Sequence, residues 1–284
     1  MQNSATRVLI TGANRGVGFS LVDVILSHNN EKQYHIIMTA RDMTAGKQAL
    51  ETLRVAHQGT SIELQQLDIS DNHSVDMLID RLRSEQSIDI LVNNAGVHMR
   101  YHTDKQSMLS QMATNYHGTV YLTQKMINAG LISDHGAIVM VSSGHGKFGD
   151  LSVRNPEAYY LLKDYQIHSD FSRLEKAVAQ YESDYCSEVR KDLWPSDVYS
   201  VSKLFLSIWT YIYGNRKDIV TSGIQVYSCS PGFCLTNMTS DLPVIPPFTA
   251  TEGAERIYKV MTMSSDITDL QGKFLNRDGV EESL

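Results

Sequence analysis

The chain has 284 residues, of which 42% are hydrophobic and 20% are charged, a composition typical of one globular domain over residues 1–284. Its formal net charge of −7 gives no support to nucleic-acid binding, which requires a basic face. Its three cysteines, Cys186, Cys229 and Cys234, lack metal-ligand spacing and are odd in number, so neither a metal site nor a disulfide framework is predicted. No signal peptide or membrane span is visible, and reduced thiols then favour a cytoplasmic protein.

The first expected strand, residues 8–10, runs into a glycine-rich turn and then into a helical stretch over residues 19–26. This order is the context of a phosphate-binding loop, because bare backbone lets a pyrophosphate approach the start of a helix. The expected contacts from this loop are Gly12, Asn14, Arg15, Gly16, Val17 and Gly18.

The second expected strand, residues 35–40, ends just before Arg41. Chains that prefer NAD usually carry an acidic residue at this strand end, where this chain has Ala40. Two guanidiniums, from Arg15 and Arg41, suit a 2′-phosphate and therefore predict NADP(H). The neighbouring acidic residue Asp42 argues against this prediction of NADP(H). The alternative is that both arginines are ordinary surface charges.

The third and fourth strands are expected over residues 61–67 and 88–92, and each ends in polar or small residues. Asp68 and Ile69 follow the third strand and Asn94 follows the fourth, at the edge where such sheets bind ligands. Helices are expected over residues 75–82 and 112–126, the second containing Asn115. An asparagine inside a helix usually faces solvent, and an inward-facing Asn115 is the alternative.

The fifth strand, residues 136–141, ends at a hydroxyl pair that includes Ser143, and a long insertion over residues 147–197 follows. Apolar residues spaced by three or four predict an amphipathic helix in this insertion. We expect the apolar face of this helix to pack on the core of the same chain, and binding of a partner protein is the alternative. The stripe consists of Phe171, Leu174, Val178, Tyr181, Tyr185 and Val189.

Tyr199 and Lys203 lie four residues apart, after stop and cap residues at 195–197, on a helix expected to end with Gly214 as its cap. Side chains with this spacing share one helix face. An ammonium about 4 Å from a phenolate stabilises it by roughly 4 kcal/mol at an effective dielectric of ~20. The pair could therefore bring a phenol toward neutrality and supply a general acid or base.

The rest of the chain predicts a strand over residues 223–229, a helix over 252–261 and a short strand over 273–275. A proline-containing loop, residues 241–249, could cover a bound ligand. Strands that alternate with helices predict an α/β protein with a doubly wound parallel sheet of the Rossmann type. Helices are expected on both faces of the sheet, with a helical insertion before the Tyr199 helix.

Taken in order, these motifs resemble the short-chain dehydrogenase/reductase family over nearly the whole chain. The resemblance rests on residues 11–18, the Asn-Asn-Ala-Gly segment at 93–96, Asn115, Ser143, and Tyr199 with Lys203. Within the family, the long segment between Ser143 and Tyr199 is most similar to the monomeric NADPH-dependent carbonyl reductases. Other family members pair through the tyrosine helix, which an insertion would cover, so the resemblance implies a monomer.

The resemblance implies an NADPH-dependent oxidoreductase that reduces a ketone, aldehyde or quinone to an alcohol. Tyr199 would donate the proton, Ser143 would bind the carbonyl oxygen, Lys203 would lower the phenol pKa and hold the cofactor ribose, and Asn115 would fix a water. Further cofactor contacts are expected from Asp68, Ile69, Asn94, Pro231, Cys234, Leu235 and Thr236.

The substrate is left open by two departures from this branch: Ser230 stands where some members have cysteine, and Phe233 where a larger aromatic is common. The expected pocket also includes His98, His145, Phe148 and Met238. The alternatives are an NADP(H)-binding sensor or scaffold without turnover, and a reductase specialised for one secondary-metabolite ketone. A sugar epimerase or dehydratase is disfavoured by the glycine spacing of residues 11–18.

Overall fold

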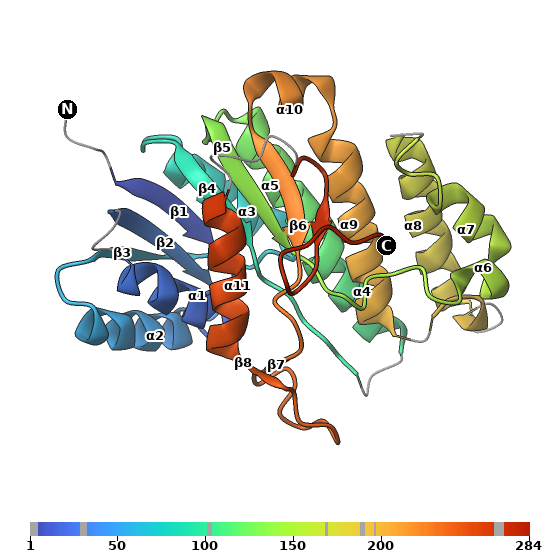
Figure 1. Ribbon diagram of the computed structural model, residues 1–284, viewed down its shortest axis with the longest axis horizontal. Coiled ribbons are helices and arrows are strands. Elements are labelled where there is room, and N and C mark those ends of the chain that lie inside the picture. The colour runs from blue at the N-terminus through green and yellow to red at the C-terminus, as the bar shows by residue number, and fades with distance from the viewer. Residues whose placement is uncertain are drawn as a thin grey trace.

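The computed structural model describes residues 5–28, 33–100, 104–167, 170–187, 191–195, 197–263 and 270–284. Its main sheet has seven parallel strands in the order β3-β2-β1-β4-β5-β6-β9, which confirms the predicted doubly wound fold (Figure 1). The strands are β1 (Thr6–Ile10), β2 (Tyr34–Ala40), β3 (Ser61–Gln66), β4 (Ile88–Asn93), β5 (Ile132–Val141), β6 (Gln225–Cys229) and β9 (Phe274–Leu275). The helices that flank them are α1 (Gly16–Ser27), α2 (Met43–Ala56), α3 (Asn72–Leu82), α4 (Lys105–Met112), α5 (Thr119–Asn128), α9 (Val198–Gly214), α10 (Lys217–Ser222) and α11 (Ala250–Thr262).

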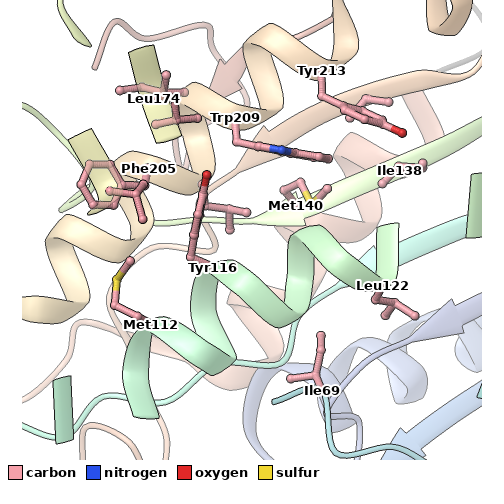
Figure 2. Packing of buried hydrophobic residues seen from close by; sticks show 14 of the residues in the cluster. Ile69, Met112, Tyr116, Leu122, Ile138, Met140, Leu174, Phe205, Trp209 and Tyr213 are labelled. Atoms are coloured by element: carbon pink, nitrogen blue, oxygen red, sulfur yellow. The ribbon is translucent and has the colours of Figure 1, made fainter. Parts of the chain in front are cut away.

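The central strands are apolar on both faces, because helices cover the sheet on either side. Val8 and Ile10 of β1 belong to one buried cluster with residues of α1, α2 and α11, whereas Leu9 belongs to a second with residues of α3, α4, α5 and α9. Figure 2 shows part of the second cluster, where Trp209 of α9 lies near Met140 of β5 and Phe205 of α9 lies on the side of Tyr116. Two dry layers therefore hold the sheet rigid beneath the ends of its strands.

The strand order reverses between β1 and β4, which are neighbours in the sheet although two strands separate them in the chain. Val8 pairs with Ile90 and Ile10 pairs with Val92 in this register. In open α/β sheets the crevice at such a reversal, outside the carboxyl ends of the strands, is where ligands bind.

The insertion forms α6 (Leu151–Arg154), α7 (Pro156–Leu162), α8 (Phe171–Cys186) and the short 3₁₀ turn η2 (Lys191–Leu193), beside α9 in Figure 1. The predicted apolar stripe is confirmed on α8 and packs inside the chain: Leu174, Val178, Tyr181 and Tyr185 are buried. The ring of Tyr181 meets that of Phe205 of α9 edge-on, with centroids 5.8 Å apart. Phe171 is half-buried at the helix start, and Val189 lies outside the described residues.

The predicted helix over residues 112–126 is confirmed as helical, but it begins earlier, at Lys105, and a π-helical turn interrupts it. The segment is α4, then a π-helical turn η1 (Ala113–Gly118), then α5. Gly118 passes so close to the end of β3 that a Cβ on it would lie 1.9 Å from the Ile69 carbonyl oxygen. The spacing of apolar residues does not reveal this tertiary contact, and it predicts one helix across the three segments.

Gly214 is also not the cap that the sequence indicated, since it is the last residue of α9 and Asn215 is the cap. A Cβ on Gly214 would lie 2.9 Å from the Val226 carbonyl oxygen, so glycine is needed there for close packing on β6. The sequence also gave no indication of β7 (Cys234–Leu235) and β8 (Phe248–Thr249), which pair in parallel. Across the described part of the chain, no helix combines the length and apolar character required to cross a membrane.

Candidate active site

The glycine-rich turn between β1 and α1 has a backbone that only glycine adopts readily. Gly12 and Gly16 have φ angles of 63° and 56°, in the left-handed region. A Cβ on Gly12 would approach the Cα of Ala95 to 3.0 Å, and one on Gly18 would lie 2.4 Å from Asn94 Nδ2. The turn is thus pressed against the end of β4 and leaves its backbone bare.

Asn94 holds this turn in place. Its Nδ2 donates to the carbonyl oxygens of Thr11 and Gly12 at 2.9 and 3.2 Å, while Thr11 Oγ1 accepts from the Asn94 and Ala95 amides at 2.9 Å. The predicted ligand contact Asn94 is therefore also the residue that fixes the loop.

The start of α1 lies next to the glycine-rich turn and could contact the same ligand. Its N-cap Arg15 is extended and makes no side-chain cap hydrogen bond, so the first amides of the helix keep their donors for a ligand. A Cβ on Gly16 would lie 3.5 Å from Thr236 Cγ2, which places the loop after β6 opposite the glycine turn. A bare turn, free helix amides and a facing loop together fit a dinucleotide pyrophosphate.

The end of β2 carries the residues predicted to choose between cofactors. The Arg41 side chain is 71% exposed, and its Nε lies 3.9 Å from Asp68 Oδ2. Asp42 caps α2 by accepting from the amides of Thr44 and Ala45 at 2.8 and 3.2 Å. Asp42, the acidic residue that argued against NADP(H), therefore serves as a helix cap, while the guanidinium of Arg41 is open to a ligand.

Four predicted catalytic residues, Asn115, Ser143, Tyr199 and Lys203, come together at the carboxyl ends of β4 and β5. Tyr199 stands in the first turn of α9, and Lys203 one turn later lies with its Nζ 5.7 Å from the centre of the Tyr199 ring. Ser143, which follows β5, lies near enough to the Tyr199 hydroxyl to lower its pKa. Asn115 and Lys203 flank Gly96: a Cβ there would lie 3.4 Å from Asn115 Oδ1 and 3.7 Å from Lys203 Nζ.

Asn115 faces inward, as in the alternative that the sequence left open, and is fully buried. Its Oδ1 accepts from the Val97 amide at 2.8 Å, and its Nδ2 donates to the Val97 carbonyl at 2.9 Å and to Ser202 Oγ at 3.1 Å. The wide π-helical turn η1 carries it, and such turns recur at functional sites. Asn115 therefore links the end of β4 to α9.

The expectation that Lys203 draws the Tyr199 phenol toward neutrality is wrong for this arrangement. Burial raises the pKa of Tyr199 to about 12, against the lowering effects of the Ser143 hydrogen bond and the charge of Arg100. The Lys203 ammonium is instead directed at the Val141 carbonyl, 2.7 Å away, and burial lowers its own pKa to about 8. The phenol is therefore protonated near neutral pH, as a proton donor must be.

Three polar residues around Tyr199 form a bridge that sequence reasoning missed. The His98 ring stacks on the Tyr199 ring, with centroids 4.6 Å apart and planes 19° from parallel. His98 Nε2 lies 3.0 Å from Asp197 Oδ1, and Arg100 Nε donates to His98 Nδ1 at 3.0 Å. The sequence predicts His98 only as pocket lining, and the predicted cap residue Asp197 marks the start of the helix but gives no sign of a partner so distant in the chain.

The residues after β6 hold the far side of the site together. Ser230 Oγ accepts from the amides of Gly144 and Gly232, each at 3.2 Å, and so joins the loop after β5 to the loop after β6. Cys234 is buried and burial raises its pKa to about 11, so it carries a neutral thiol. Ser230, which stands where some carbonyl reductases have cysteine, therefore has a structural role in this chain.

Of the other residues expected to line the pocket, some lie near Ser143 and others do not. His145 is exposed, and its amide donates to Ser143 Oγ at 3.1 Å, next to the reacting groups. Phe148 packs edge-on against Tyr159 in the insertion instead, with centroids 5.5 Å apart. Ile245, in the loop between β7 and β8, is 81% exposed, and this loop extends away from the body in Figure 1. No group of potential metal ligands gathers among the residues that the structure describes.

Comparison with known proteins gives matches along the whole chain. A family model described as short chain dehydrogenase matches residues 6–155. The chain is 30% identical over 291 residues to carbonyl reductase [NADPH] 3 of Mus musculus, covering 99% of each chain. It is 31% identical over 290 residues to carbonyl reductase [NADPH] 1 of Sus scrofa, covering 99% of this chain and 95% of that one. The solved structure of salutaridine reductase from Papaver somniferum has a TM-score of 0.80 and 25% identity, covering 95% of this chain and 99% of that one.

Proposed function

Because the chain belongs to the short-chain dehydrogenase family, we propose that it reduces a ketone, aldehyde or quinone to an alcohol with Tyr199 as the proton donor. At the coarser level, the chain is an NADP(H)-dependent oxidoreductase similar to carbonyl reductases. The observation that carries the finer proposal is the gathering of the protonated Tyr199 phenol, Ser143, Lys203 and Asn115 at one edge of the sheet, the edge that also carries the glycine-rich turn.

In the proposed mechanism, bound NADPH supplies a hydride to the carbonyl carbon. As negative charge grows on the carbonyl oxygen, the hydroxyl groups of Ser143 and Tyr199 hydrogen-bond to it more strongly than in the ground state. Tyr199 then transfers its proton to that oxygen and the alcohol forms. Tyr199 stands on α9 and Ser143 lies two residues after the end of β5, so both donors are held near rigid elements and little reorganisation is needed during the reaction.

Asn115 and Lys203 serve the return of the proton to Tyr199. Both Nδ2 protons of Asn115 are taken by Val97 and Ser202, while its Oδ1 has accepted only one hydrogen bond. One acceptor position therefore remains, and we assign it to a water that links Lys203 to solvent. With its pKa lowered to about 8, Lys203 exchanges protons readily near neutral pH.

The preference for NADPH over NADH is assigned to Arg15 and Arg41. Ala40 is buried at the end of β2 and leaves no carboxylate to hold the ribose hydroxyls. Both arginines are exposed at the edge of the glycine-rich turn, and Arg41 is only distantly paired, at 3.9 Å, with Asp68. The 2′-phosphate would gain charge-assisted hydrogen bonds there.

We further propose a single domain and a monomer, since α8 lies over α9 and its apolar stripe is buried there. Light scattering on the purified protein tests this, and a dimer mass would contradict it. A cytoplasmic location stays a prediction of the sequence.

The central test compares the wild type with Tyr199→Phe on small aldehydes, quinones and cyclic ketones, with NADPH and with NADH. We expect NADPH-dependent turnover that Tyr199→Phe reduces by about 10²-fold or more while NADPH still binds. Reduction by Tyr199→Phe at the wild-type rate would contradict the assignment of the acid. Binding of NADPH without its oxidation across the panel would instead favour a sensor or scaffold.

A reductase specialised for one secondary-metabolite ketone is the second candidate. It is favoured by the 0.80 TM-score to salutaridine reductase, a higher score than those of the carbonyl reductase structures compared. The same panel separates the two: turnover of many carbonyls supports a broad reductase, and turnover confined to one ketone supports the specialised one.

A further inference from the structure

Next to Tyr199 lies a hydrogen-bonded bridge made by His98, Arg100 and Asp197, which the proposed mechanism does not use. Its members come from two segments, the stretch after β4 and the start of α9. The His98 side chain is only 14% exposed, although histidine is a residue that water solvates well. A mostly covered imidazole with a partner on each nitrogen is a positioned group.

The two hydrogen bonds fix the tautomer of His98. Arg100 Nε can only donate, so His98 Nδ1 must accept, and the ring proton therefore stands on Nε2. That proton is donated to Asp197 Oδ1 at 3.0 Å. The neutral imidazole thus joins a cation to an anion, and protonating Nδ1 would break its bond to Arg100.

Asp197 connects the bridge to the backbone of Tyr199. Its Oδ1 accepts from the Tyr199 amide at 3.2 Å, and its Oδ2 accepts from the Ser200 amide at 3.1 Å. Burial alone would raise the pKa of Asp197, but hydrogen bonds from His98 and Ser200 outweigh it and lower the pKa to about 2. One carboxylate therefore begins α9 and also anchors the ring that lies against Tyr199.

The bridge also determines which charges face the phenol. Arg100 Nη1 is buried and has no hydrogen-bond partner among the described residues, so the Nε bond to His98 is what anchors this side chain. Arg100 favours the phenolate and Asp197 opposes it, and their effects on Tyr199 have opposite sign. The other polar or ionisable groups around Tyr199 are Ser143, Cys234 and Lys203.

We propose, on the basis of the function proposed above, that His98 is a positioning residue that holds the ring of Tyr199 and keeps the charges of Arg100 and Asp197 joined beside it. It does not touch the reacting atoms itself. Its two actions are separable, because stacking needs a flat ring and the bridge needs an acceptor facing Arg100 with a donor facing Asp197.

Two variants separate these actions. His98→Phe keeps an aromatic ring against Tyr199 without the bridge, and His98→Gln keeps an amide acceptor and donor without the ring. The matched control is His28→Phe, because His28 stacks on Tyr258 in the same way, with centroids 4.5 Å apart, at the far end of α1.

We expect each His98 variant to lower kcat for carbonyl reduction by about tenfold or more, with KM for NADPH and the melting temperature near those of the wild type. His28→Phe should leave kcat unchanged. Wild-type kcat in both His98 variants would overturn the proposal, and so would a loss that merely parallels lost stability or NADPH binding.

A measurement without turnover tests the charges. In protein labelled with [¹³Cζ]tyrosine, the Tyr199 signal is the one absent from Tyr199→Phe, and its titration reports the phenol directly. Asp197→Asn keeps one of the two capping oxygens but removes the anion, so the titration should move to lower pH by about half a unit or more, whereas Arg100→Met should not lower it.

An unmoved titration in Asp197→Asn would overturn the charge part of the proposal. If the titration moves but the wild type reduces no carbonyl, the bridge stands and the proposed function fails. The two failures are therefore distinguishable.

Discussion

Replacing Asn115 by alanine should damage both stability and turnover, because this buried amide joins the end of β4 to α9. The change removes three hydrogen bonds, two to the Val97 backbone and one to Ser202 Oγ. At about 1 kcal/mol for each bond, the free energy of unfolding should fall by about 3 kcal/mol. For a chain of this size, that corresponds to a melting temperature about 5 °C lower.

The effect on turnover should be separate from the effect on stability. Without the amide, the Val97 carbonyl and amide can move away from α9, and the acceptor that we assign to a water beside Lys203 is gone. We expect kcat to fall by about 10- to 100-fold at a temperature where the variant is fully folded. Thermal unfolding followed by circular dichroism, and initial rates of NADPH oxidation, measure the two effects.

Asn155→Ala is the matched control. Asn155 is also buried, and its Oδ1 accepts from the Ala158 amide at 3.1 Å as the cap of α7 in the insertion. Losing a cap costs about 1 kcal/mol, so this variant should lose stability but keep the wild-type kcat. If Asn115→Ala melts like the wild type, or if Asn155→Ala loses turnover equally, the reasoning is refuted.

Three further predictions concern the cofactor site and Lys203. Gly12→Ala should weaken NADPH binding by about tenfold or more in a fluorescence titration, since its Cβ would strike the neighbouring backbone at 3.0 Å. Gly59→Ala, with a similar φ of 77° but open space around it, should leave binding unchanged. Arg41→Ala should raise the Kd of NADPH by about tenfold and leave that of NADH unaltered, unlike Arg83→Ala at the C-cap of α3, which should change neither. Because burial lowers the pKa of Lys203 to about 8, the unfolded state binds more protons above that pH. The unfolding free energy of the wild type, relative to Lys203→Met, should therefore rise by about 2 kcal/mol from pH 8 to pH 10, and a flat difference in urea unfolding would contradict the burial of this amine.

The order of strands and helices could be predicted because each leaves a local pattern. Continuous apolar runs such as that of β1 mark strands covered on both faces, and the three-or-four spacing of α8 marks an amphipathic helix. Tyr199 and Lys203 were found in the same way, since their separation is a property of one helix. Such sequence patterns can be recognised without knowing which other segments pack against them.

What could not be predicted depends on contacts between distant segments. The π-helical turn around Asn115 ends at Gly118, which lies against the Ile69 carbonyl about fifty residues earlier in the chain, and residue spacing shows neither feature. The pKa of Tyr199 was misjudged because spacing reveals a nearby ammonium but not the burial of the phenol. The bridge from His98 to Asp197 joins residues 99 positions apart, and neither partner has a local signal for the other.

The cover that α8 forms over α9 has a consequence for how the protein behaves in solution. Phe205 and Trp209 of α9 are buried by their own chain, which supports the monomer proposed above. Activity per molecule should then be the same in a dilute assay as in a concentrated stock, with no lag while subunits find each other.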